Sequence, residues 1–173
     1  MRKKALLATL AAVIGLATAS AAAPSGDHWI VPGVRIGAAV LEQADQGALV
    51  RDLGEPDQTV QRGDRAWYRF GPQTDGAPPD ELVVEFDLAK DAPLEISTAS
   101  PLYRMRNGLG VGSAAATVRA VQGAPLCEGG NADGEGVIVY DTIWFRISQG
   151  NVSRVSIRKQ LSAADFQVGP IHC

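Results

Sequence analysis

The amino-acid sequence repeats one order of segments at an offset of about 70 residues. A glycine-rich start at 34–37 leads into a short apolar-periodic stretch and a Gly-x-Pro motif at 54–56, and three strand-like runs follow. A second glycine-rich start at 109–112 leads into a similar stretch, a second Gly-x-Pro motif at 123–125 and three more such runs. A repeat of this kind constrains the whole architecture more strongly than any single predicted helix or strand does. We therefore expect two copies of one helix-plus-sheet unit.

Each copy is predicted to contain one short helix. Asp45 is the candidate N-cap of the first helix and Gly54 its end, while Ser113 and Gly123 take these places in the second copy. A proline two residues after each terminal glycine prevents the helix from continuing. Helices of two to three turns are marginal alone, so we expect both to pack on a sheet.

The strand-like runs alternate between apolar and polar residues. They lie at 66–70, 82–88, 94–97, 138–140, 143–148 and 154–158. Period-two alternation is typical of antiparallel strands with one packed and one solvated face. The predicted fold class is α+β, with two tandem repeats of short helix followed by a three-stranded antiparallel sheet and the helices on one sheet face. The units are expected at 22–100 and 101–173, forming one compact domain.

The N-terminus is typical of a secretory signal peptide. A positive head at 1–4 precedes an apolar run to about residue 17 and a small-x-small pattern at 19–21. The run is shorter than the roughly 20 residues that a membrane span needs. We expect a signal peptide over 1–21 and an exported product, periplasmic or secreted, with no membrane insertion after cleavage.

The charge balance argues against nucleic acid as a partner. The chain has 16 Lys and Arg against 19 Asp and Glu, a net charge of −3. Removing the basic residues of the signal peptide leaves 13 against 19, a net charge of −6. An acidic chain without a basic run is a poor ligand for nucleic acid and for anionic membrane surfaces.

Two cysteines, Cys127 and Cys173, both lie in the second copy. In an exported protein the pair predicts one disulfide, which would stabilise the fold by about 2–4 kcal/mol. Two free thiols, or a bond from Cys173 to another chain, are the alternatives.

The order Gly-Val-x-x-Gly, short helix, Leu-Gly-x-Pro and Trp-Tyr strand resembles a unit of secreted bacterial proteins. Single copies occur in the outer-membrane assembly lipoproteins of the SmpA/OmlA (BamE-like) group, and tandem copies in the β-lactamase-inhibitor-protein fold. The resemblance covers 36–96 and 109–158. The chain lacks the lipid-anchor cysteine of the first group and the disulfide in each repeat of the second. The resemblance implies a fold and a non-catalytic binding role, and no site residue is transferred from it.

The strongest local signal lies on the predicted outward face of the sheet. If Ala66 points inward with its alternate neighbours, tryptophan and arginine side chains of both copies point outward: Arg65, Trp67, Arg69, Trp144, Arg146 and Arg154. Tryptophan flanked by arginine is typical of interface anchors. Two structural alternatives are cross-strand pairing of the arginines with Glu85 or Asp87, and burial of the face by the other copy.

Other motifs favour simple structural roles. The glycines of 108–113 lack the flanking strand and the lysine of a phosphate-binding loop, so a tight turn explains them. The acidic loop at 131–136 lacks the bidentate glutamate of a calcium loop. His28 and His172 are the only histidines, which leaves serine hydrolase chemistry and a shared zinc site little support. We expect no catalytic residue, no metal and no cofactor.

These observations favour an exported, non-enzymatic binding or inhibitor-type module. It would use the solvent face of its sheet to bind a protein or cell-envelope component. The alternatives are an envelope structural or assembly factor without a discrete ligand site and, less favoured, a small hydrolase.

Overall fold

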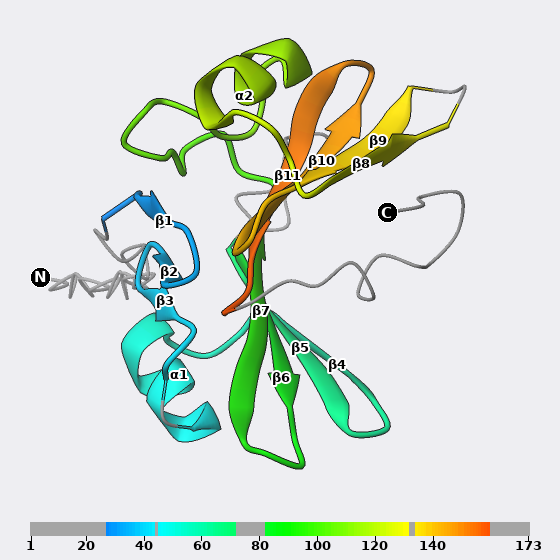
Figure 1. The fold of residues 1–173 in the computed structure, drawn as a ribbon. Helices are drawn as coiled ribbons and strands as arrows, with labels where there is room; N and C mark the ends of the chain where they lie inside the picture. The colour runs from blue at the N-terminus through cyan, green and yellow to red at the C-terminus, as the bar shows by residue number, and fades with distance from the viewer. Residues whose placement is uncertain (1–26, 44, 72–81, 132–133, 160–173) are drawn as a thin grey trace, which may run out of the picture.

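The computed structural model describes residues 27–43, 45–71, 82–131 and 134–159 (Figure 1). The predicted signal peptide lies outside the described residues. The described chain is mostly β-structure with two helices of eight residues each, α1 (Gln46–Leu53) and α2 (Ala115–Gln122). None of its helices is long and apolar enough to cross a membrane.

The strands form two antiparallel sheets. The small sheet has the order β1-β2-β3, from β1 (Ile30–Val31), β2 (Arg35–Ile36) and β3 (Ala39–Val40). The large sheet has the order β4-β5-β6-β7-β11-β10-β9-β8. Its strands are β4 (Gln58–Arg62), β5 (Arg65–Phe70), β6 (Leu82–Asp87), β7 (Ala92–Thr98), β8 (Cys127–Gly130), β9 (Glu135–Val139), β10 (Ile143–Ser148) and β11 (Asn151–Ile157). Both halves of this sheet diverge from β7 and β11, which pair in the middle (Figure 1).

The predicted fold class is wrong. In the described residues each helix is followed by four strands of the large sheet rather than three, and a separate small sheet precedes α1. The missed strands β4 and β8 are the two edges of the large sheet. Four of the five residues of β4 are exposed, and β8 carries two glycines, so neither shows apolar alternation. The boundary between the expected units at residue 100 stays a prediction.

The helix ends differ between the two helices. Asp45 caps α1 as predicted, and its Oδ1 accepts a hydrogen bond from the Ala48 N–H at 2.6 Å. The predicted cap of α2 is wrong, because Ala114 is its N-cap and gives no side-chain bond. The Ser113 hydroxyl instead accepts from the Gly110 N–H at 3.1 Å and so supports the turn before the helix.

Replacing Asp45 by alanine is expected to lower the free energy of unfolding by about 1 kcal/mol, because it leaves the Ala48 N–H without its acceptor. Urea denaturation measures the loss. Ala114→Asp at the uncapped α2 is the matched control, and it should leave stability unchanged or raise it. If Ala114→Asp lowered the free energy of unfolding as much as Asp45→Ala does, the assigned caps would be contradicted.

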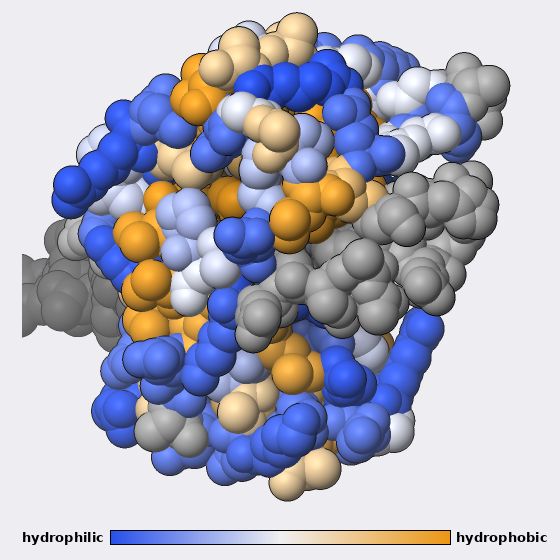
Figure 2. Space-filling model, viewed as in Figure 1, coloured by the Kyte–Doolittle hydropathy of each residue, from blue (hydrophilic) through white to orange (hydrophobic). Residues whose placement is uncertain are grey.

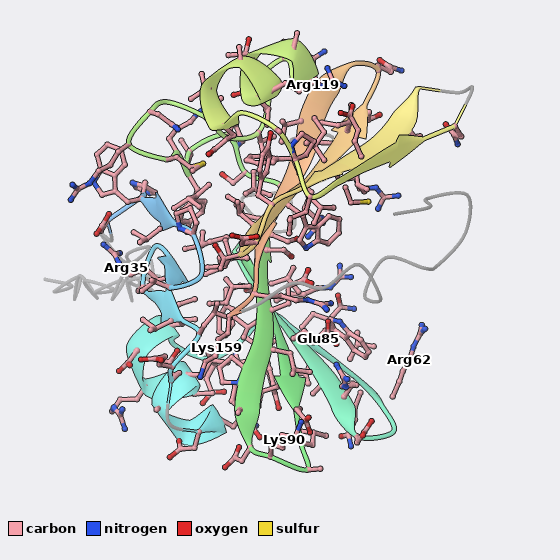
Figure 3. The ribbon with its side chains drawn as sticks, in the orientation of Figure 1. Arg35, Arg62, Glu85, Lys90, Arg119 and Lys159 are labelled. Carbon is pink, nitrogen blue, oxygen red and sulfur yellow. The ribbon has the colours of Figure 1, made fainter. Side chains whose placement is uncertain are left out.

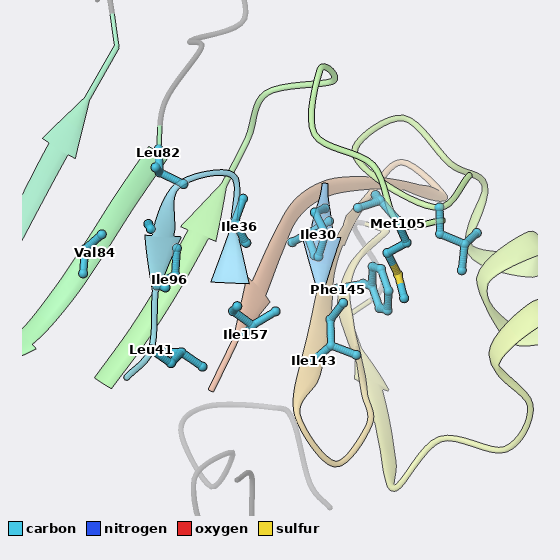
Figure 4. Close-up of a cluster of buried hydrophobic side chains, with 14 of the residues drawn as sticks. Ile30, Ile36, Leu41, Leu82, Val84, Ile96, Met105, Ile143, Phe145 and Ile157 are labelled. Carbon is cyan, nitrogen blue, oxygen red and sulfur yellow. The ribbon is translucent and has the colours of Figure 1, made fainter. Parts of the chain in front are cut away.

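One hydrophobic core lies between the large sheet and the layer formed by the small sheet and both helices. Leu49 of α1 and Val118 of α2 are fully buried in it. Figure 4 shows Ile30 and Ile36 of the small sheet beside Ile96 of β7 and Phe145 of β10. In the view of Figure 2, hydrophilic side chains dominate the two ends of the molecule, and apolar residues gather between the helices. The helices and the small sheet thus cover one face of the large sheet.

Candidate functional site

The face of the large sheet that points away from this core carries the predicted site residues, and we call it the outer face. In β5, Ala66, Tyr68 and Phe70 are buried in the core, whereas the residues between them are only partly buried. The intervening residues are Arg65, Trp67 and Arg69. The alternation predicted from the sequence is confirmed in this strand. Figure 3 shows Glu85 and Arg62 on the side of the sheet away from α1.

The second group of predicted residues lies on β10 and β11. Phe145 belongs to the core, so its neighbour Trp144 points to the outer face and is partly buried there. Arg146 is exposed, and Arg154 of β11 stands directly opposite it in the strand register. We call Trp144, Arg146 and Arg154 the β10 group, and Arg65, Trp67 and Arg69 the β5 group.

The structure places the two groups on one face without bringing them into contact. Strands β5 and β10 are four positions apart in the sheet order. With about 4.8 Å between neighbouring strands, Trp67 and Trp144 are separated by about 19 Å across the sheet. The two tryptophans therefore lie apart on this face and do not form one aromatic cluster.

A polar network fills the middle of the outer face. Glu85 of β6 and Glu95 of β7 are direct partners in the register. Arg65 Nη1 lies 2.7 Å from Glu85 Oε1, and Arg158 Nε lies 2.7 Å from Glu95 Oε2. Two arginines thus compensate two opposed carboxylates.

Next to these ion pairs lie two buried hydroxyls. Ser97 and Ser156 are partners across the central β7–β11 pair and are at most 5% exposed. The Arg154 Nη1 donates to the Ser97 Oγ at 3.1 Å. This bond connects the β10 group to the centre of the face.

Burial dominates the titration of Glu95. Desolvation raises the pKa of its carboxyl above the ordinary value, and the charge of Glu85 acts in the same direction. The Arg158 guanidinium and the Ser156 hydroxyl oppose this shift but do not cancel it. Buried carboxylates with a shifted pKa occur in structural ion-pair networks as well as in functional sites. The raised pKa of Glu95 therefore does not by itself assign a function to this residue.

Sequence reasoning missed the Glu85–Glu95 pair. The alternation along the strand suggested Glu85 and Asp87, which share a strand face, only as cross-strand partners of the arginines. In the structure Asp87 accepts from the Ala89 and Lys90 N–H groups at 3.1 and 3.2 Å, in the turn after β6. The register of β6 on β7 contains a shift between Glu85 and Phe86, so a count along the two strands could not identify the partner.

A small apolar cluster occupies the outer face around Trp144. Cys127 of β8 and Val137 and Val139 of β9 are buried, and Trp144 packs against them. Trp144, Val139 and Cys127 follow one another across three neighbouring strands in the register. We call these four residues the Trp144 cluster. Because Cys173 lies outside the described residues, the Cys127–Cys173 disulfide stays a prediction.

A cavity of about 270 Å³ lies at the other end of the β8–β9 hairpin. Arg119 of α2 and Glu128 of β8 form a salt bridge at its edge, and glycines of the hairpin line much of the rest. The salt bridge lowers the pKa of Glu128. No group of three or more His, Cys, Asp or Glu side chains is placed to hold a metal ion in the part of the chain that the structure describes. This cavity contains none of the predicted binding residues.

Comparison with known proteins shows a fold but no family. No protein-family model matches the chain, and no curated protein matches it. Among solved structures, it is similar to the uncharacterized protein yfeY from Escherichia coli, with a TM-score of 0.50 and 12% identity over 73% of this chain and 97% of that one.

Two further structures show weaker likeness. A cysteine-rich secretory protein from Staphylococcus aureus has a TM-score of 0.49 and 15% identity, over 75% of this chain and 48% of that one. An extracellular protein with an SCP domain from Bacillus anthracis has a TM-score of 0.45 and 11% identity, over 67% of this chain and 43% of that one. The chain thus spans less than half of either protein. The comparisons give no support to the BamE-like or β-lactamase-inhibitor resemblance.

Proposed function

We propose that this chain is an exported, non-enzymatic binding module that attaches a protein or cell-envelope component to its outer face. The observation that carries the proposal is the position of the β5 and β10 groups. Their tryptophan and arginine side chains lie on the sheet face away from the helices and are not fully buried. Tryptophan and arginine are the residues most often found as binding hot spots.

The charge of the outer face indicates what kind of partner surface fits it. Six arginines lie on this face: Arg62, Arg65, Arg69, Arg146, Arg154 and Arg158. Their main acidic neighbours, Glu85 and Glu95, are engaged in the central ion pairs. Two more acids among the described residues of this face, Asp87 and Glu135, bring its acids to four against the six arginines. A partner surface with net negative charge would be electrostatically complementary.

The N-terminal pattern of residues 1–21 supports export, and the pair of cysteines agrees with an oxidising compartment. The expected site of action is the periplasm or the extracellular medium. A role as an assembly factor without a discrete ligand site is the second candidate. It is favoured by the Arg65–Glu85 pair, which gives one predicted binding residue a structural use.

Trp67→Ala is expected to weaken partner binding by about 30-fold or more, because a hot-spot tryptophan contributes about 2 kcal/mol or more. Folding should remain intact, because Trp67 lies outside the hydrophobic core. The measurement is affinity capture from the native periplasm or culture fluid on immobilised wild type and variant, followed by titration of the captured component. Circular dichroism of the variant checks that it is folded.

The matched control is Trp29→Ala, which removes a tryptophan that is 47% exposed and lies outside the large sheet. It should retain the captured component at wild-type affinity. Equal capture by the wild type, the Trp67 variant and a Trp67/Trp144 double alanine variant would contradict the proposal and favour the assembly role.

A further inference from the structure

We propose that strand β4 is the pairing edge for a second copy of this chain. The two β4 strands lie antiparallel, with Val60 of one copy opposite Val60 of the other. This pairing joins the two large sheets edge to edge into one continuous sheet. It does not depend on whether the outer face binds a partner.

The open side of β4 has the regularity of a pairing strand. β4 is the outermost strand of the large sheet, and no described strand pairs with its other side (Figure 1). Its residues pair with β5 in one unbroken register, from Gln58 opposite Arg69 to Arg62 opposite Arg65. The unpaired N–H and C=O groups along such an edge are a template for another strand.

The turn after β4 determines which backbone groups point to the open side. A two-residue connection leads to β5, and its first residue, Gly63, has a φ of 61°. The residues that flank such a connection exchange both backbone hydrogen bonds, and bonded and non-bonded pairs then alternate along the strands. Arg62 and Val60 therefore direct their N–H and C=O groups to β5. Thr59 and Gln61 direct theirs to the open side.

The opposite edge of the large sheet is protected against such pairing. Glu128 of β8 points to the core side, because it pairs with the core residue Ile138, and it forms a salt bridge with Arg119 of α2. A charge that points inward is one of the features that prevent strand addition. β4 contains no proline, glycine or lysine, and its one charged residue, Arg62, points to the outer face with Arg65. Of the two edges, β4 is therefore the one open to pairing.

The sequence of β4 is complementary to itself in an antiparallel pair. When Thr59 of each copy bonds to Gln61 of the other, the two Val60 residues form the closer, non-hydrogen-bonded kind of pair. Arg62 then lies opposite Gln58, so no like charges face each other directly. Val60 is also the single apolar residue of β4 and the only one that is not fully exposed. Every residue of β4 has a compatible partner in this register, which favours a second copy over an unrelated extended segment.

The pairing extends an apolar row across the joined outer faces. Val60 lies opposite Trp67 in the register of β4 on β5. The row therefore consists of Trp67 and Val60 of one copy followed by Val60 and Trp67 of the other. Three strand spacings, about 14 Å, separate the two Trp67 side chains, which is less than the distance from Trp67 to Trp144 in one copy. If the outer face binds a partner as proposed, the dimer presents two β5 groups to it.

Sedimentation equilibrium of the full chain, expressed for export, tests the pairing. A few backbone hydrogen bonds and one valine contact make a small interface, so the expected dissociation constant is about 0.1–1 mM. Val60→Lys places like charges opposite each other and should raise this constant by about tenfold or more. An equimolar mixture of Val60→Lys and Val60→Glu places opposite charges there and should restore a dimer of wild-type strength.

Two further variants separate pairing from folding. Thr59→Pro removes a donor that points to the open side and none that points to β5, so it should fold and remain monomeric. The matched control is Leu126→Lys, which places a lysine at a residue that is 59% exposed beside the opposite edge. It should dimerise as the wild type does. Circular dichroism checks that each variant is folded.

A wild type that stays monomeric up to about 1 mM would overturn the pairing. Dimerisation of Val60→Lys at wild-type strength would also overturn it, as would a mixture of the lysine and glutamate variants that stays monomeric. The pairing and the proposed function fail separately. If the charge variants behave as expected but Trp67→Ala still captures its component, the pairing stands and the proposed function falls.

Discussion

Phe145→Ala is expected to lower the free energy of unfolding by about 3–5 kcal/mol, the range found for large aromatic residues in cores. The Phe145 side chain is fully buried. Its strand neighbours in the register are Val155 and Ile138, both of them core residues, and its ring contacts the edge of the Tyr140 ring. Removal of the ring leaves a cavity in the half of the core beneath α2. The neighbouring strands β9 and β11 hold β10 in place, so the surrounding side chains can fill little of that cavity.

Urea denaturation followed by circular dichroism measures this loss, and the slope of the transition should stay that of the wild type. Trp67→Ala is the control, because it removes an even larger ring from the outer face. It should cost about 1 kcal/mol or less, as expected away from the core. Similar losses for the two variants would show that the outer face is part of the core, and the assignment of the two faces would be wrong.

Arg158→Met is expected to cost about 2–3 kcal/mol at neutral pH. The substitution keeps most of the side-chain volume but removes the positive charge beside Glu95, whose side chain is only 13% exposed. A buried carboxylate that loses its partner is strongly destabilising, by about 3–5 kcal/mol when fully buried. Arg158 is itself 30% exposed, so the expected loss is smaller.

The loss should depend on pH in one direction. Because the pKa of Glu95 is raised in the folded protein, its contribution to stability is full below the ordinary value of 4.5 and declines as pH rises through the raised pKa. Removing Arg158 raises that pKa further. The cost of Arg158→Met should therefore be smaller near pH 4, below the ordinary pKa of the carboxyl, than near pH 8.

Glu95→Gln provides the control for this prediction. In that background the carboxylate is absent, so Arg158→Met should cost little and its cost should not change with pH. The unfolding free energies of the wild type, the two single variants and the double variant together give the coupling free energy between Arg158 and Glu95. A cost that stays constant between the two pH values in the wild-type background would show that Arg158 acts through packing rather than through the charge of Glu95.

Local patterns predicted which side of the sheet each residue faces. Tyr68 and Trp67 are neighbours in the sequence, and their opposite environments follow from period-two alternation alone. The capping of α1 by Asp45 and the ends of both helices at Gly54 and Gly123 are equally local. These features depend on a few consecutive residues, which is why a single sequence was sufficient.

Features that depend on pairing between distant strands could not be predicted in this way. The edge strand β4 has no apolar alternation, because most of its side chains are exposed at the edge of the sheet. Two-residue strands such as β1 are too short for any periodicity to show. For these reasons the count of three strands for each helix was wrong.

The sequence by itself determined that Trp67 and Trp144 would share the sheet face opposite the core, because the direction of a side chain alternates along any strand. Only the tertiary structure decided that four strand positions separate them and that Glu95 lies opposite Glu85. Strand order and register are set by which extended segments pack best against the whole core. That is a property of all the strands together and is not encoded in any one of them.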